Sequence, residues 1–85
     1  MVAARPSSRK PTVDQVFGQV LRTLRLQQGL SQESLGLATG SGRTFISQLE
    51  RGERGASLKT LFRLAPHLGH TPAEIVLLVE TQEPT

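Results

Sequence analysis

The chain has 85 residues, no cysteine and a formal net charge of +3. This length fits one small domain, and a domain of this size often depends on a partner copy for stability. The lack of cysteine excludes a disulfide framework, and no apolar segment follows the basic N-terminal residues, so neither a signal peptide nor a membrane span is expected. We expect a cytoplasmic protein.

The charge is unevenly distributed along the chain. Residues 1–64 hold all ten Lys and Arg residues and only four of the seven acidic ones, whereas residues 65–85 hold three acidic residues and no Lys or Arg. A basic body favours a polyanionic partner, although an ordinary solvated surface is the plainer alternative.

The first eleven residues, MVAARPSSRKP, lack apolar periodicity and are rich in Arg, Ser and Pro. This composition predicts a flexible basic arm over residues 1–11. The arm is either an untidy terminus or a segment in which Arg5, Arg9 and Lys10 contact DNA phosphates.

Five segments with the helical period follow. The first is predicted to begin after Thr12, which forms a capping box with Gln15, and to stop at Gly29. Its apolar stripe is Phe17, Val20, Leu21 and Leu24.

The second helix is predicted to begin at Ser31, which caps its first turn. Leu30 and Leu35 flank this cap as a hydrophobic staple. Gly36 is unfavourable inside a helix, so it indicates the close approach of another helix.

Residues 39–42 (TGSG) predict a tight turn, with Gly42 as the N-cap of a third helix from Arg43 to about Arg51. Phe45, Ile46 and Leu49 lie on one side of that helix and must be buried. Its opposite side and flanks carry Arg43, Thr44, Ser47, Gln48 and Arg51. Such side chains can bond base edges and phosphates, although a merely solvated helix face would look similar.

The fourth helix is predicted to be capped by Ser57 and bent or shortened by Pro66. Its inward-facing residues are expected to be Leu58, Leu61, Leu64, Ala65 and Leu68. Thr71, Pro72 and Glu74 then give a strong helix start, with an N-cap, a proline at the first helical position and a capping-box glutamate. The fold class is therefore all-α, with a disordered tail expected at residues 81–85.

The segment GLSQESLGLATGSGRTFISQLERG, followed by SLKTLFRLAPHLG, resembles the phage repressor and Cro-like (XRE-type) helix-turn-helix family of bacterial regulators. The resemblance covers about residues 14–79. It implies a five-helix, lambda-repressor-like domain over residues 12–80. It also implies a transcriptional regulator that binds double-stranded DNA sequence-specifically, as a homodimer on a palindromic operator.

The resemblance also implies roles for individual residues. The positions that match base-reading residues are Arg43, Thr44, Ser47 and Gln48, and those that match phosphate-binding residues are Gln32, Arg51, Arg54 and Ser57. Arg25 and Glu50 hold equivalent positions beside the buried faces of their helices and are expected to form an ion pair, which the family also has. The chain departs from the family pattern at Gly36, Ser41, Gly42 and Pro66.

The fifth segment, IVLLV, is apolar almost all round and exposes more apolar surface than one face against a small core can cover. Relatives of this length commonly use this helix in a twofold dimer. The expected interface residues are Ile75, Val76, Leu78 and Val79. The alternative is a helix that lies wholly on its own core.

An enzyme is not expected, because the chain offers no cysteine and no plausible pair of catalytic carboxylates. His67 and His70 lack further ligands, so neither a metal nor a cofactor is expected. The alternative to a DNA-binding regulator is an antitoxin or other interaction module whose main partner is a protein.

Overall fold

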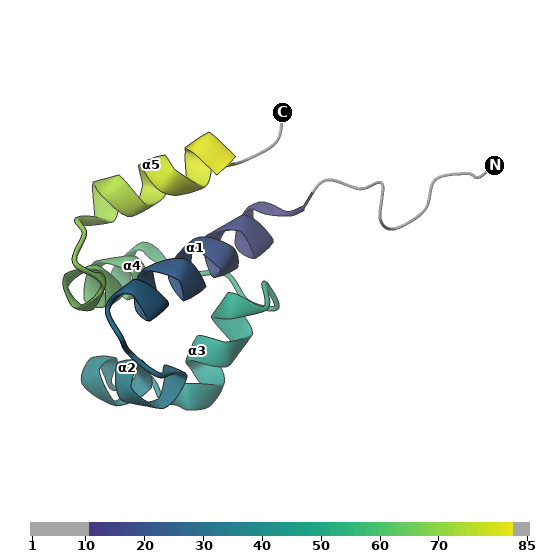
Figure 1. Cartoon of the computed structure of the whole chain (residues 1–85). Coiled ribbons are helices and arrows are strands. Elements are labelled where there is room, and N and C mark those ends of the chain that lie inside the picture. The colour runs from purple at the N-terminus through teal and green to yellow at the C-terminus, as the bar shows by residue number, and fades with distance from the viewer. Residues whose placement is uncertain (1–10, 83–85) are drawn as a thin grey trace.

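The computed structural model describes residues 11–82, and within them all regular structure is helical (Figure 1). Most of the expected N-terminal arm and the last three residues of the expected tail lie outside this range. The elements are α1 (Val13–Gln27), α2 (Gln32–Thr39), α3 (Arg43–Glu50), α4 (Leu58–Leu64), the short 3-10 helix η2 (Ala65–Leu68) and α5 (Pro72–Gln82). Helix α5 thus continues two residues beyond the expected end of the domain at residue 80.

Local side-chain caps explain where α1 and α5 begin. Thr12 accepts a hydrogen bond from the backbone N–H of Gln15 at 3.1 Å, and the Gln15 side chain accepts one from the N–H of Thr12 at 2.9 Å. Thr71 and Glu74 form the same reciprocal arrangement at 3.1 and 2.9 Å. Each pair satisfies backbone donors that the first turn leaves free. The predicted helix starts are confirmed.

The core forms around α1, which lies between α5 on one side and α2 and α3 on the other (Figure 1). Every helix contributes at least one buried apolar side chain, so no element is held by its backbone hydrogen bonds alone. The buried cluster consists of Val20, Leu21, Leu24, Leu35, Ile46, Leu49, Leu61, Leu64, Ala65, Leu68 and Ile75.

Pro66 interrupts the fourth helix as predicted. Helix α4 ends at Leu64, and the chain continues as the 3-10 turn η2 until Gly69, whose φ is 74°. Proline lacks the N–H that a continuing α-helix needs. The tighter turn still buries Ala65 and Leu68.

Two expectations about burial are wrong. Leu58 was expected to face inward but is 73% exposed at the first residue of α4, at the edge of a groove that Val13 and Val76 also line. Ile75, expected at a dimer interface, is only 1% exposed and packs in the core of its own chain. It is therefore not available to a second copy in this conformation.

Gly36 permits the close approach that its position predicted. A Cβ placed on it would lie 2.6 Å from the carbonyl oxygen of Gly42 and 2.8 Å from the backbone nitrogen of Arg43. The Gly36 carbonyl also accepts hydrogen bonds from the N–H groups of Ser41 and Gly42 at 3.0 and 3.1 Å. The close neighbours are therefore the turn and the start of α3, and they fix how tightly α2 and α3 are joined.

Candidate nucleic-acid interface

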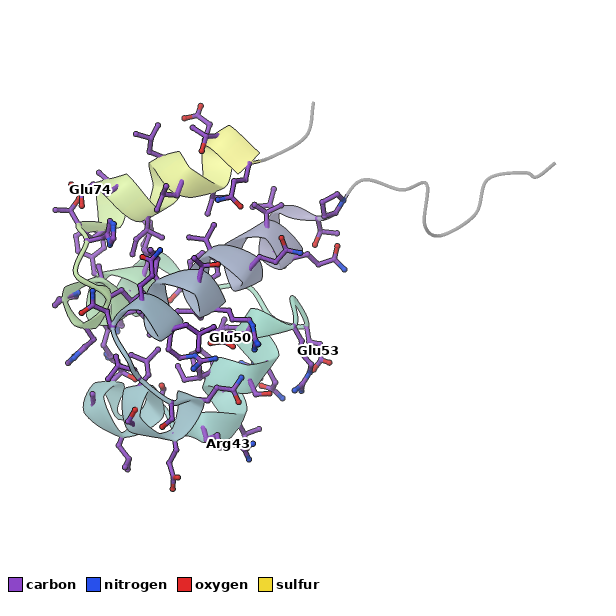
Figure 2. The ribbon with its side chains drawn as sticks, in the orientation of Figure 1. Arg43, Glu50, Glu53 and Glu74 are labelled. Carbon is purple, nitrogen blue, oxygen red and sulfur yellow. The ribbon has the colours of Figure 1, made fainter. Side chains whose placement is uncertain are left out.

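Helix α3 is held from behind and leaves a polar face outward. Ile46 and Leu49 are fully buried and Phe45 is partly buried, whereas Arg43 and Thr44 are exposed. Ser47 and Gln48 are partly exposed. Figure 2 shows Arg43 at the surface at one end of α3, Glu53 in the loop beyond the other end, and Glu50 directed toward α1. The helix thus presents the polar side chains that the sequence placed on its outward side and flanks.

A buried ion pair joins α1 to the end of α3. The Arg25 guanidinium contacts both carboxylate oxygens of Glu50, with Nε to Oε2 at 2.5 Å and Nη2 to Oε1 at 3.0 Å. The side chains are only 6% and 4% exposed. Arg25 Nη1 also donates to the carbonyl of Leu30 at 2.7 Å, so the pair is linked to the loop before α2. The structure thus brings together the two residues expected to pair.

The hydrogen bond to the Glu50 side chain raises the pKa of Arg25 above its usual value, against the opposing effect of desolvation. A fork of guanidinium donors that matches a carboxylate is among the stronger side-chain interactions. Because both side chains are buried, removal of either Arg25 or Glu50 would leave the other charge unpaired between α1 and α3, which is strongly disfavoured.

Gln32 connects α2 to the same group. Its Nε2 donates to Glu50 Oε1 at 3.0 Å, so the first residue of α2 braces the last residue of α3. An amide nitrogen carries two hydrogens, and one remains for an outside acceptor. The brace and the phosphate contact implied by the family resemblance are therefore compatible.

Arg51 is surrounded by polar partners at the C-terminal end of α3. Its Nε and Nη2 donate to Glu53 Oε2 and Oε1 at 2.8 and 3.1 Å, and its Nη1 donates to the Ser47 hydroxyl. The hydrogen bonds between Arg51 and Glu53 lower the pKa of the Glu53 carboxyl below its ordinary value and raise the pKa of Arg51. Both side chains are more than half exposed, so a phosphate could replace Glu53 as the partner of Arg51.

Arg54 lies in the loop after α3 and contacts two side chains of that helix. Its Nε donates to Gln48 Oε1 at 3.1 Å, and its guanidinium carbon lies 5.4 Å from the centroid of the Phe45 ring. The second contact is within the range of a cation–π interaction. Neither contact could be predicted from the sequence, because the helical spacing rules do not extend to a residue beyond the helix end.

Ser57 begins α4 as a cap. Its hydroxyl accepts from the backbone N–H of Thr60 at 3.1 Å and donates to the Thr60 hydroxyl at 3.0 Å.

Among residues 11–82 no group of three or more potential metal-ligating side chains occurs. None of the helices in this range is both long and apolar enough to cross a membrane.

Comparison with known proteins agrees with this geometry. A helix-turn-helix family model matches residues 21–75. The control protein C.BamHI of Bacillus amyloliquefaciens is 37% identical over 62 residues, which are 72% of this chain and 76% of that protein.

Two solved structures are also similar. The restriction-modification controller protein C.AhdI from Aeromonas hydrophila superimposes with a TM-score of 0.69 at 42% identity, over 73% of this chain and 94% of that one. The restriction-modification controller protein C.Esp1396I, solved as a tetramer with its natural 35 base-pair operator, shares the fold with a TM-score of 0.73. It is 24% identical, over 85% of this chain and 95% of that one.

The fold and the outward face of α3 define a helix-turn-helix protein. The chain belongs to the XRE-type helix-turn-helix family of DNA-binding transcriptional regulators, and its relatives include control proteins. This is a family of regulators and not of enzymes.

Proposed function

We propose that this protein is a cytoplasmic regulator that binds a palindromic operator sequence-specifically as a homodimer. The observation that carries the proposal is the placement of α3. Arg25, Glu50 and Gln32 brace it from behind, while Arg43, Thr44 and the flanking polar residues remain accessible in front. A rigid helix with such a face fits the major groove.

The exposed residues fall into two proposed groups. We assign base contacts to Arg43, Thr44, Ser47 and Gln48, of which Arg43 is the strongest candidate because a guanidinium can donate two hydrogen bonds to guanine. We assign phosphate contacts to Gln32, Arg51, Arg54 and Ser57, which flank α3 at the starts of α2 and α4 and in the loop after α3.

The dimer is supported by apolar surface on α5. Val76 is 50% and Leu77 is 56% exposed, and Leu78 and Val79 are partly covered. Leu77 was not among the expected interface residues. We include it in the proposed interface because it is exposed, and we leave out Ile75 because it is buried. Because α5 lies across α1 from α3 (Figure 1), a second copy could dock on it without covering α3. A twofold dimer that places two α3 helices about 34 Å apart would match successive major grooves.

The relatives favour this regulator over a module whose main partner is a protein, since they include the control protein C.BamHI and the restriction-modification controller protein C.AhdI. Selection of bound duplexes from a random library tests the proposal directly. The wild-type protein should select a palindrome at low ionic strength. Arg43→Ala should lose preference at one base per half-site, by about 1–3 kcal/mol.

Arg51→Ala provides the contrast within the same helix region. Loss of a phosphate contact should weaken binding without changing the preference at the positions contacted by Arg43 and Gln48, and should reduce the salt dependence of binding by about one unit of slope. Of the residues assigned to base contacts, only Ser47, which loses its Arg51 partner, is affected directly. If wild-type protein bound none of the duplexes at low salt, the proposed function would be wrong.

A further inference from the structure

The Gln48 side chain is held by Arg54 in a defined orientation. Arg54 Nε lies 3.1 Å from Gln48 Oε1, and the guanidinium is positioned at the Phe45 ring by a contact of 5.4 Å. A guanidinium has donors only. While this hydrogen bond is kept, the amide turns its oxygen toward Arg54 and its NH₂ group away.

This orientation changes what the Gln48 amide can recognise. A free glutamine amide recognises adenine through two hydrogen bonds, in which its oxygen accepts from N6 and its nitrogen donates to N7. With Oε1 engaged by Arg54, Gln48 offers mainly its two Nε2 hydrogens. Guanine presents two acceptors in the major groove, N7 and O6, and thymine presents O4, and neither base places an amino donor there. Adenine also has an acceptor, N7, but pairs it with the N6 amino group, and cytosine presents the N4 amino group.

Electrostatics acts in the same direction. The second lone pair of Gln48 Oε1 could still accept from adenine, but the adenine amino group would then lie beside the Arg54 cation, and its hydrogens carry partial positive charge. The acceptor atoms of guanine and thymine carry partial negative charge and would be attracted to that cation.

We propose that Arg54 is a positioning residue that makes Gln48 select guanine or thymine over adenine or cytosine. This inference rests on the proposed function, because it requires α3 to lie in the major groove. It adds to the phosphate contact assigned to Arg54, because only Nε takes part in the bond to Gln48 and the Nη1 and Nη2 groups remain for a phosphate.

Arg54→Lys separates the two roles. Lysine keeps the positive charge and can still donate hydrogen bonds, but its flexible ammonium lacks the planar group that stacks on an aromatic ring and holds the donor in one direction. If Arg54 acted only through its charge, this variant would bind the same sequences with similar affinity. If Arg54 positions Gln48, the variant keeps much of its affinity and loses base preference at one position.

The experiment is duplex selection with wild-type protein, Gln48→Ala, Arg54→Lys and Arg51→Ala. The position that loses preference in Gln48→Ala identifies the base contacted by Gln48. There, wild-type protein should prefer guanine or thymine by roughly tenfold, and Arg54→Lys should lose most of this preference. Arg51→Ala, which also removes an arginine near the end of α3, should keep it.

A wild-type preference for adenine or cytosine at that position, or an unchanged preference in Arg54→Lys, overturns the inference while leaving the proposed function intact. Failure of wild-type protein to select any sequence removes the proposed function itself. In the free protein, the NMR signals of the Gln48 side-chain NH₂ should shift in Arg54→Lys, and unchanged signals would also contradict the inference.

Discussion

Glu50 shows how one residue connects three helices. Its carboxylate accepts two hydrogen bonds from Arg25 on α1 and one from Gln32 on α2, although Glu50 itself ends α3. With only 4% of its side chain exposed, water cannot replace these partners. Removal of the carboxylate would leave the Arg25 charge buried without compensation.

We therefore expect Glu50→Ala to destabilise the fold by about 3–5 kcal/mol. Urea or thermal unfolding followed by circular dichroism measures this change. Glu53→Ala is the matched control, because it removes a carboxylate from an exposed arginine pair and should have little effect. Equal melting of Glu50→Ala and wild-type protein would show that the buried pair does not stabilise the fold.

The Arg51–Glu53 pair predicts a local pH dependence. The Arg51 hydrogen bond lowers the pKa of Glu53 below 4.5, so the pair stabilises the folded state above the unfolded-state pKa. This contribution is lost as the pH falls through the lower, folded-state pKa. In Arg51→Ala the pKa of Glu53 should rise toward 4.5, as measured by NMR titration of its carboxyl carbon. Arg63→Ala, on α4, should leave it unchanged, and the absence of a rise in Arg51→Ala would refute the assigned cause.

At the scale of elements, the contact between α1 and α3 depends on Gly18. A Cβ at this position would lie 2.5 Å from the carbonyl oxygen of Glu50 and 2.8 Å from its carbonyl carbon. These are backbone atoms, so the two helices would have to separate. Glycine inside a helix costs about 1 kcal/mol relative to alanine, and here it allows the approach that the Arg25–Glu50 pair needs.

Gly18→Ala should therefore lower the free energy of unfolding despite the better helix propensity of alanine. Overpacking of this kind typically costs about 1–3 kcal/mol. Chemical denaturation compares this variant with Gln19→Ala, which changes an exposed neighbour in the same helix and should be nearly neutral. A Gly18→Ala protein more stable than wild type would mean that the two helices can move apart at little cost.

The sequence was informative where structure depends on nearby residues. Thr12, Ser31, Ser57 and Thr71 all cap helices as predicted, because capping involves residues three apart. Leu58 was assigned wrongly because the helical period places it beside the buried residues of α4 but does not show whether another element covers the first turn. The contact of Arg54 with Gln48 was missed because the path of a loop is not encoded in a periodic pattern.

At the scale of the whole molecule, the unbroken apolar run of α5 gives no period from which to choose the core-facing side. The structure assigns Ile75 to the core and leaves Val76 and Leu77 outward. These two residues are consecutive and therefore lie about 100° apart around α5. Val76 also lines an apolar groove of about 230 Å³ together with Val13 and Leu58.

If a second copy docks on α5, Val76→Glu with Leu77→Glu should convert the protein to monomer. Each glutamate would place a charge in an apolar interface without a partner. Sedimentation at micromolar concentration measures the change, and Leu26→Glu, at a 54% exposed leucine of α1, is the control that should leave assembly unchanged. Wild-type protein that sediments only as monomer, with or without DNA, would exclude the dimer.

The hydrogen bonds that converge on Glu50 have a consequence for the docking event itself. Helices α1, α2 and α3 share one buried polar group, so the angle between the two helices of the motif is set before any duplex arrives. Little ordering entropy is then lost by the protein on association. Any mismatch in groove width or curvature must be accommodated by the nucleic acid. If the protein binds the proposed palindromic operator, flexible base steps between the half-sites should therefore strengthen the complex even where no side chain touches them.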